Sequence, residues 1–447
     1  MTLIDSIIAA LDQWLEHLRD SSFRTDDQTS CMASMELQAQ ALGKRIAQLA
    51  LSHLLESSGS GYSHSSLPCH CGGRQRFQRH SKRSVRTLIG EVSYRRAYYR
   101  CPQCGASCFP FDEQILQSPR DISPGVERVV ALLSAHLSFI QAEHVLEEVA
   151  GVKLTARQIE TVSESIGTEA ELLLRQEEGI AATKGLAETG GPSQPEPTTF
   201  IVEMDGVQVG LQDGSWQEAK CGVIYELSQR VEINTGRWEL LKRHRCVLRG
   251  DVVGFRRRLW ALCLRAGIRE QDRIVVIGDG AEWIDQTAQL LFPRAMRILD
   301  YYHASERIWA VAAARWGEGS QHGRRWSESK LEQLKGGQVG KVIGSIRRLK
   351  IRAQEGRAVA AAATKYMRGR VEQMRYKEYR ESGLPIGSGA VESSCKQVVT
   401  ARCKQAGMRW SRQGVDAILA LRSFVLNERL DELCPKPEVS LDWAKAA

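Results

Sequence analysis

Hydrophobic side chains in the first 60 residues recur every three or four positions, which is the spacing of a helix with one apolar face. The first such face consists of Leu3, Ile7, Ile8, Leu11, Trp14, Leu15 and Leu18. A second helical pattern runs from about Met35 to Leu55. We expect these helices either to cover the core of the next domain or to pair subunits.

Apolar positions return to the helical period between residues 124 and 167. The expected helices are Val126–Leu137, Gln141–Val149, Ala156–Ile166 and a further one that runs to about Gln176. Gly151 turns the chain and Thr155 can cap the third helix, which is the outline of a helix-turn-helix. Arg157 then lies at the start of a helix that can read DNA. Three-helix packing without DNA contact is the alternative.

The pattern changes after residues 186–199, a linker rich in glycine and proline. Short apolar runs now indicate strands, with helical stretches between them. In chain order the expected elements are strands Phe200–Gly206, Val207–Leu211 and Glu218–Leu227, helix Val252–Ala266, strand Arg273–Gly280, helix Ala281–Leu291 and strand Ala295–Leu299. Helical sequence follows at about 301–383. With that block treated as an insertion, the order matches a ribonuclease H-like fold.

A new helix is expected to begin within residues 384–396. One proline and two glycines interrupt the preceding pattern, Ser388 can cap the helix, and residues 390–406 contain neither proline nor glycine. Glu392 lies about one turn inside this helix. The basic residues expected to contact DNA on and after it are Lys396, Arg402, Lys404 and Arg409. The alternative is an ordinary surface pair of Glu392 with Lys396, four residues apart.

Three acids occupy positions suited to phosphoryl transfer. Asp205 ends the first apolar run, Asp279 ends the fourth strand, and Glu392 lies on the helix after the fifth. Neighbouring parallel strands end side by side, so Asp205 and Asp279 can share an ion, and carboxylate oxygens suit Mg²⁺ or Mn²⁺. Two such ions can activate the attacking oxygen and stabilise the leaving one. Taken singly, each Asp-Gly pair is usually only a turn.

Charge is concentrated in one segment of the 447-residue chain. The net charge is +8 and the pI is near 8.9. Between residues 74 and 100, nine Lys or Arg face a single acid, Glu91, so this segment accounts for that charge. Such a segment suits the phosphates of double-stranded DNA; a solvated basic loop is the alternative. The residues expected to contact phosphate are Arg74, Arg76, Arg79, Lys82, Arg83 and Arg86.

Two cysteine pairs, each closed by glycine, flank this basic segment. They are Cys69 with Cys71 and Cys101 with Cys104. Strand-like sequence at Ser84–Thr87 and Glu91–Tyr99 lies between them, so the pattern indicates a zinc ribbon with one structural Zn²⁺. The first pair has the tight Cys-x-Cys spacing, so His70 or Cys108 can serve as the fourth ligand instead. A set of free thiols is the alternative.

Several stretches resemble the DDE transposases of bacterial insertion sequences, in particular the ISKra group. They are residues 203–207, 278–284, 300–303, 384–396 and 407–411, together with the cysteine-rich ribbon. The resemblance implies a transposase that cuts the ends of its element and joins them to target DNA. It assigns Asp205, Asp279 and Glu392 as the metal-binding triad. The Cys-x-Cys pair departs from the Cys-x2-Cys that the family tends to have.

The insertion contributes further candidates. Asp300 and His303 resemble a motif of related transposases and share a helix face, so His303 can contact DNA or steady a carboxylate. The alternative is that Asp300 only caps a helix. Trp309, Trp316 and Trp326 can stack on a flipped base, although we expect them to be buried in the core.

We therefore expect an α+β multidomain protein. Its expected parts are an N-terminal helical region at 1–60, a zinc-ribbon-like basic module at 61–120, a helix-turn-helix-like module at 121–185, a linker at 186–199, a ribonuclease H-like catalytic domain at 200–430 and a tail at 431–447. The expected partners are terminal inverted repeats and target DNA, with a homo-oligomer forming on the DNA. No membrane span or secretory signal is visible, so we expect a cytoplasmic location. A non-catalytic DNA-binding protein derived from a transposase, and a ribonuclease H-like nuclease, are the competing functions.

Overall fold

The computed structural model describes residues 3–20, 31–116, 120–186, 197–235 and 237–436. The chain forms two compact units, one of residues 1–163 with 434–447 and one of residues 164–433. The boundary between them falls inside a helix, whereas the expected linker at 186–199 lies mostly outside the described residues. No helix among the described residues is long and apolar enough to cross a membrane.

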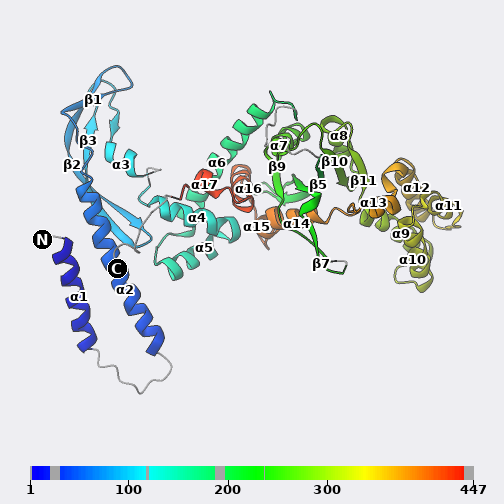
Figure 1. Ribbon diagram of the computed structural model, residues 1–447, viewed down its shortest axis with the longest axis horizontal. Helices are drawn as coiled ribbons and strands as arrows, with labels where there is room; N and C mark the ends of the chain where they lie inside the picture. Colours follow the sequence, from blue (N-terminus) through cyan, green and yellow to red (C-terminus); the bar gives the residue numbers. More distant parts are fainter. Residues whose placement is uncertain (1–2, 21–30, 117–119, 187–196, 236, 437–447) are drawn as a thin grey trace. The chain divides into compact units, whose positions relative to one another are not determined.

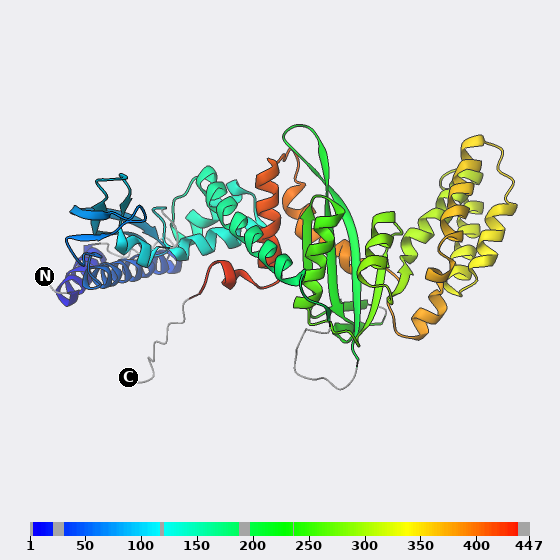
Figure 2. The same cartoon turned by 90° about the horizontal axis from the view of Figure 1, so that it is seen from above.

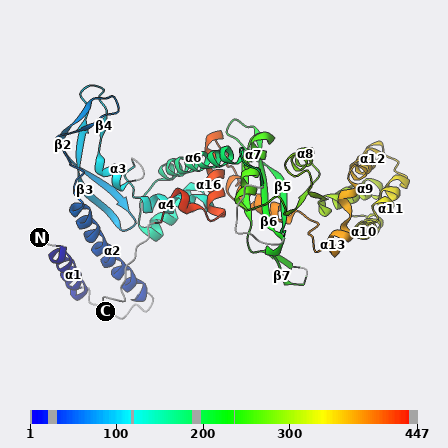
Figure 3. The same ribbon diagram turned by 45° about the horizontal axis from the view of Figure 1, so that its top comes forward.

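The first unit begins with the two expected helices, α1 (Leu3–Asp20) and α2 (Cys31–Ser57), and continues into an antiparallel sheet. Its strands are β1 (Ser66–Pro68), β2 (Arg74–Thr87), β3 (Gly90–Arg100) and β4 (Ser107–Cys108), in that spatial order. Figure 3 shows the long β2–β3 hairpin, and α2 packs against β3. The predicted strands were therefore correct in position but shorter than the real hairpin.

The rest of the first unit is helical. Its elements are α3 (Pro110–Ile115), α4 (Pro124–His136), α5 (Phe139–Val145), a π-helical turn η1 (Leu146–Ala150) and the start of α6 (Ala156–Ala181). As predicted, Gly151 takes a left-handed conformation with φ 68°. Thr155 and Gln158 exchange backbone-to-side-chain hydrogen bonds across the first turn of α6. The prediction of a separate helix after Ile166 is wrong, because α6 is continuous.

The second unit contains a five-stranded sheet (Figure 1) with the spatial order β11-β10-β5-β6-β9. The strands are β5 (Thr199–Gly210), β6 (Trp216–Glu226), β9 (His244–Arg249), β10 (Arg273–Gly278) and β11 (Met296–Leu299). β5, β6 and β9 are antiparallel neighbours, whereas β10 runs parallel to both β5 and β11. A short 3-10 turn η3 (Leu227–Gln229) leads from β6 to the hairpin of β7 (Arg230–Asn234) and β8 (Arg237–Leu240), which forms a separate two-stranded sheet.

Two strand predictions were wrong in a related way. Residues 207–211 are not a second strand, because β5 continues through Gly206, which pairs with Lys220. A Cβ on Gly206 would lie 2.2 Å from the Glu218 carboxylate, so glycine serves close approach here and not a turn. The third antiparallel strand is β9, which the sequence analysis missed. Its run His244–Arg249 has three basic or polar residues among six, and it lies at the edge of the sheet.

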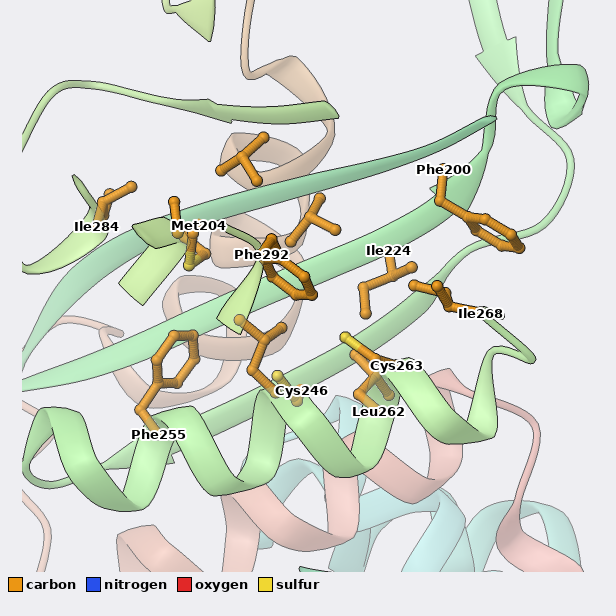
Figure 4. Packing of buried hydrophobic residues seen from close by; sticks show 14 residues of the cluster. Phe200, Met204, Ile224, Cys246, Phe255, Leu262, Cys263, Ile268, Ile284 and Phe292 are labelled. Atoms are coloured by element: carbon orange, nitrogen blue, oxygen red, sulfur yellow. The ribbon is translucent and has the colours of Figure 1, made fainter. Parts of the chain in front are cut away.

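The core of this unit lies under helix α7 (Val252–Arg265) and helix α8 (Glu282–Leu291), both of which were predicted. Figure 4 shows Phe255, Leu262 and Cys263 of α7 directed at sheet residues such as Met204 and Ile224. Successive strand residues point to opposite faces. Glu203 and Asp205, on either side of Met204, therefore face away from this core.

The predicted insertion is helical, and its elements gather into the bundle seen in yellow in Figure 2. They are α9 (Tyr301–Trp316), α10 (Gln321–Lys335), α11 (Val339–Arg348), α12 (Gln354–Arg368), a 3-10 turn η4 (Val371–Met374) and α13 (Tyr376–Glu381). The expectation of buried tryptophans fails for Trp309, which is 39% exposed. Trp316 and Trp326 are half-buried and pack together with ring centroids 5.6 Å apart.

The chain then forms α14 (Gly389–Cys395), a π-helical turn η5 (Lys396–Thr400) and α15 (Ala401–Cys403), followed by α16 (Arg412–Leu426) and α17 (Leu430–Leu433). The uninterrupted helix predicted for residues 390–406 is therefore broken by a π turn. α14 packs against β5 and β6, and α16 packs against β9. Because α14 contacts Glu203, it lies on the face of the sheet opposite α7.

Candidate active site and metal centre

Asp205 and Asp279 are placed side by side by the parallel pairing of β5 and β10. Ile277 pairs with Glu203, so Asp279, two residues further on, comes level with Asp205. One carboxylate oxygen of Asp205 accepts from Gly206 N at 2.7 Å, and one of Asp279 accepts from Ala281 N at 2.7 Å. Both side chains are half-buried.

The electrostatics of Asp205 show that neighbouring charges act on it. Burial raises the pKa of Asp205, and the negative charge of Asp279 raises it further, whereas His303 and the thiol of Cys395 act in the opposite direction. A carboxylate whose ionisation is opposed by burial and by a neighbouring acid would be stabilised by a cation. His303 Nδ1 also lies 3.4 Å from Glu306 Oε2.

Helix α14 is held over this pair of acids by Glu203. One carboxylate oxygen of Glu203 accepts from Val391 N at 2.8 Å, and the other accepts from Tyr225 Oη at 2.8 Å. The side chain is fully buried, and this burial raises the pKa of Glu203 to about 7. Cys395, at the other end of α14, hydrogen-bonds to both Asp205 and Cys221.

A second buried carboxylate, Asp300, holds the start of the same helix. One oxygen of Asp300 caps α9, accepting from Tyr302 N at 2.5 Å and His303 N at 3.1 Å. The other accepts from Ser388 N at 2.5 Å and also from Ser388 Oγ. Asp300 therefore caps α9, which is the role that the sequence analysis gave as the alternative. The expected cap at Ser388 is wrong, because its hydroxyl donates to Asp300 and accepts no hydrogen bond from the first turn of α14.

Glu392 itself projects from α14 as a half-buried side chain. Its carboxylate has no hydrogen bond or ion pair within the described part of the chain, so the Lys396 side chain is not its surface partner. Among those same residues, only the cysteine group described below brings three or more ligand atoms within 4.8 Å of one another. The ligand oxygens of Asp205, Asp279 and Glu392 therefore do not all lie within 4.8 Å of one another.

Helix α12 of the insertion contacts the loop that carries Asp279. Tyr366 Oη donates to the Asp279 carbonyl at 2.5 Å, and Arg370 donates to the Gly280 carbonyl at 2.6 Å. Gly280 has φ 82°, and a Cβ there would lie 2.7 Å from Arg370 Nε. The insertion thus fixes the backbone of one candidate ligand, a contact that no short sequence motif indicated.

Glu203 was the functional residue most accessible to sequence reasoning. It precedes Asp205 by two residues, so the period of a strand places both on one face. The roles of Tyr366, Arg370 and Ser388 depend on long-range packing, and no local pattern signals them.

The four predicted cysteines come together at one end of the β2–β3 hairpin. Cys69 Sγ lies 3.5 Å from Cys104 Sγ, and Cys71 Sγ lies 3.7 Å from Cys101 Sγ. Two sulfurs at about 2.3 Å from one tetrahedral zinc ion are roughly 3.8 Å apart. The four thiols can therefore hold a metal ion such as zinc, and neither His70 nor Cys108 is needed as a substitute.

Backbone geometry explains why the tight first pair still fits. The Gly72 N–H donates to the Cys69 carbonyl at 3.0 Å, and the Gly105 N–H donates to the Cys101 carbonyl at 3.0 Å, so each pair forms a turn closed by a left-handed glycine. The backbone N–H of Cys104 lowers the pKa of Cys101 to about 7. A thiol of that pKa is readily deprotonated, as a metal ligand must be.

The basic segment divides into two groups. Arg83 is only 8% exposed and pairs with Asp112 at 2.6 Å and Asp121 at 2.9 Å. The expected contact of Arg83 with phosphate is therefore wrong, and its role is structural. Arg96 also pairs with Asp112. Arg74 donates to Ser66, and Arg86 donates to the Lys153 carbonyl. The exposed residues with no partner within the described residues are Arg76, Arg79, Lys82 and Arg100.

The other expected DNA contacts also differ in exposure. Arg402 is fully buried against the ring of Trp410, so it is not available to DNA. Arg157 is exposed and paired with Glu160 at 2.6 Å, and Lys396 is exposed. Lys404 Nζ lies 6.0 Å from the centroid of the Trp216 ring, and Arg409 Cζ lies 5.1 Å from it.

Comparison with known proteins gives relatives that are described only as a family. A UPF0236 protein of Caldanaerobacter subterraneus subsp. tengcongensis is 23% identical over 361 residues, which cover 78% of this chain and 69% of the relative. A second protein of that organism is 24% identical, with the same coverage of both chains, and a third is 24% identical over 65% of its own length. Residues 72–431 match the model of this family. Since that match spans most of the chain, the protein belongs to UPF0236, an uncharacterised protein family.

Proposed function

We propose that the chain is a DDE transposase of the ISKra group, with a ribonuclease H-like catalytic domain in its second unit. One observation carries the proposal. Asp205 and Asp279 stand level on adjacent parallel strands, and the charge of Asp279 raises the pKa of Asp205, while α14, which bears Glu392, is anchored to the strand that carries Asp205.

The sheet supports the fold assignment. Three antiparallel strands followed by two parallel ones, in the spatial order β9-β6-β5-β10-β11, match the expected ribonuclease H-like arrangement of first, fourth and fifth strands. The helical block at residues 301–383 fits as an insertion before the helix that carries the third acid.

The donor set suits Mg²⁺ or Mn²⁺, because hard cations prefer carboxylate oxygens. Asp205, Asp279 and Glu392 would hold the ions, and the mutual repulsion of the two aspartates supports that fit. When bound, two such ions supply activation of the attacking oxygen and stabilisation of the leaving oxygen. In cleavage, water adds to phosphorus and the bond to the 3′ oxygen breaks. In strand transfer, that 3′ hydroxyl attacks a target phosphorus and displaces its 3′ oxygen.

The remaining parts supply DNA binding. Arg76, Arg79 and Lys82 of the zinc-ribbon-like module would contact phosphates, and the start of α6 would read terminal repeats as part of a helix-turn-helix. The chain would act as a homo-oligomer on its element ends. The names of the relatives add support, since the first covers eleven loci of one genome and the second covers four. Many copies in one genome are what a mobile element produces.

The test is cleavage of DNA carrying the inverted repeats that flank the gene, in Mg²⁺. Asp205→Asn, Asp279→Asn and Glu392→Gln should each abolish cleavage while repeat binding stays within about twofold of the wild type. Glu282→Gln is the matched control, because this exposed acid lies three residues from Asp279 and outside the triad. A triad variant that cuts at the wild-type rate would remove that residue from the site. Wild-type protein that binds the repeats without cutting would favour a non-catalytic DNA-binding protein.

A further inference from the structure

The helical insertion carries a concentration of positive charge as large as that of the basic hairpin. Residues 339–370 contain nine Lys or Arg and one acid, Glu355. These residues form α11, α12 and the loop between them, and α11 packs against α12. No sequence motif indicates a role for this charge.

A surface cavity of about 810 Å³ lies between α11 and α12. Five exposed cations line it, and none of its lining residues is acidic; they are Arg347, Lys350, Arg357, Lys365 and Arg368. We call these five residues and their cavity the α11–α12 groove. Within the described residues no carboxylate pairs with any of them, and only Arg357 makes hydrogen bonds, to the carbonyls of Ile351 and Arg352.

Some cations elsewhere on the same bundle are instead paired locally with an acid. Arg324 pairs with Glu328, Arg375 with Glu378 and Lys377 with Glu381, each within one helical turn. Five exposed like charges line one hollow that has no acid in its lining, so they form a positive surface. An external anion bound there would be stabilised by that charge.

The spacing of the cations favours an extended anion over a single phosphate. Arg357, Lys365 and Arg368 follow one face of α12, and eleven residues of helix span roughly 16 Å. Phosphates of one DNA strand advance about 3.4 Å along the duplex axis, so the stripe matches about five of them. Apolar residues such as Ile346 and Ala361 line the cavity between the cations and suit the sugar edges.

We propose that the α11–α12 groove binds the phosphodiester backbone of duplex DNA and is a binding surface separate from the hairpin. The identity of the polyanion as DNA rests on the proposed function. α12 also holds the Asp279 loop through Tyr366, which neighbours Lys365. DNA held in the groove is thus connected by one rigid helix to the candidate active site.

The test compares two triple variants of the full-length chain in a salt titration of duplex binding. Arg347→Ala, Lys350→Ala and Arg368→Ala remove three groove cations. Arg324→Ala, Arg375→Ala and Lys377→Ala remove the same charge from locally paired positions. Each lost phosphate contact lowers the slope of log K against log salt by about 0.9. The groove variant should therefore flatten the slope by roughly two to three, and the control variant by less than one.

Variants that retain the charge separate a lost phosphate contact from a loss of folding. All six side chains are exposed, so thermal unfolding of both variants should match the wild type. If the groove variant folds poorly, Arg347→Lys with Arg368→Lys retains the charge and should retain the slope. Wild-type protein that binds no duplex overturns the proposed function. Duplex binding with equal slopes for both triple variants overturns the groove alone, as does a groove contribution seen with inorganic phosphate but not with duplex.

Discussion

Replacing Asp300 with alanine should loosen the start of α14 while leaving the sheet intact. The change removes a cap on α9, which costs about 0.5–2 kcal/mol, and leaves the buried Ser388 N–H without an acceptor, which costs about 1–3 kcal/mol. We expect the local stability to fall by about 2–4 kcal/mol in all. The natural assay is hydrogen exchange of the amides at residues 388–395, since local opening reports local stability. At about 1.4 kcal/mol per tenfold, their exchange should quicken roughly 30- to 700-fold.

Ser388→Ala is the control for this prediction. It deletes only the hydroxyl and leaves the N–H bonded to Asp300, so it should cost about 1 kcal/mol. Glu306→Ala removes a nearby exposed carboxylate and should change little. If Asp300→Ala exchanged no faster than Ser388→Ala, the reasoning that one carboxylate joins two helix starts would be refuted. Under the proposed function, Asp300→Ala should also lose cleavage while keeping DNA binding.

Three further predictions concern the first unit. Purified protein should contain one zinc per chain, and Cys101→Ser with Cys104→Ser should lose it; elemental analysis that finds no zinc in the wild type would contradict the thiol geometry. Arg76→Ala, Arg79→Ala and Lys82→Ala together should flatten the salt slope of DNA binding by about two to three with little change in stability. Asp112→Ala should instead destabilise the unit by about 3–5 kcal/mol in denaturant, because Arg83 keeps only Asp121 while Arg96 and the Tyr94 hydroxyl lose their shared acceptor. Equal unfolding midpoints for wild type and Asp112→Ala would refute that assignment.

The local sequence pattern predicted most of the fold, because in most elements the apolar residues recur at the spacing of the helix or strand that forms. Helices α7 and α8 and strand β10 lie almost where they were expected. The failures occur where an element depends on neighbours. β9 is a basic edge strand with little apolar signal, and the π turn after α14 interrupts a sequence that has no helix breaker.

The candidate site was predictable in outline for the same reason. Acids that follow apolar runs are visible in sequence, and the parallel pairing of β5 and β10 brings two of them together. The residues that hold the site, such as Glu203, Asp300 and Tyr366, act through contacts between segments 87 or more residues apart. Such contacts leave no local pattern.

Charge counts are the least specific part of the sequence, because a basic residue can be used inside the fold or left for a partner. Strand alternation turns Arg83 inward toward Asp112, while Lys82 stays exposed on the other face. Arg402 is likewise buried, with its guanidinium over the ring of Trp410. What distinguishes a cation available to DNA is the absence of a local carboxylate, which depends on tertiary structure.

The exposed hairpin residues and the α11–α12 groove both meet that criterion, although they lie more than 200 residues apart in sequence. The two surfaces should therefore contribute additively to the salt dependence of binding, so a variant lacking both triplets should lose about twice the slope of either. A combined loss no larger than one triplet alone would mean that a bound duplex engages only one surface.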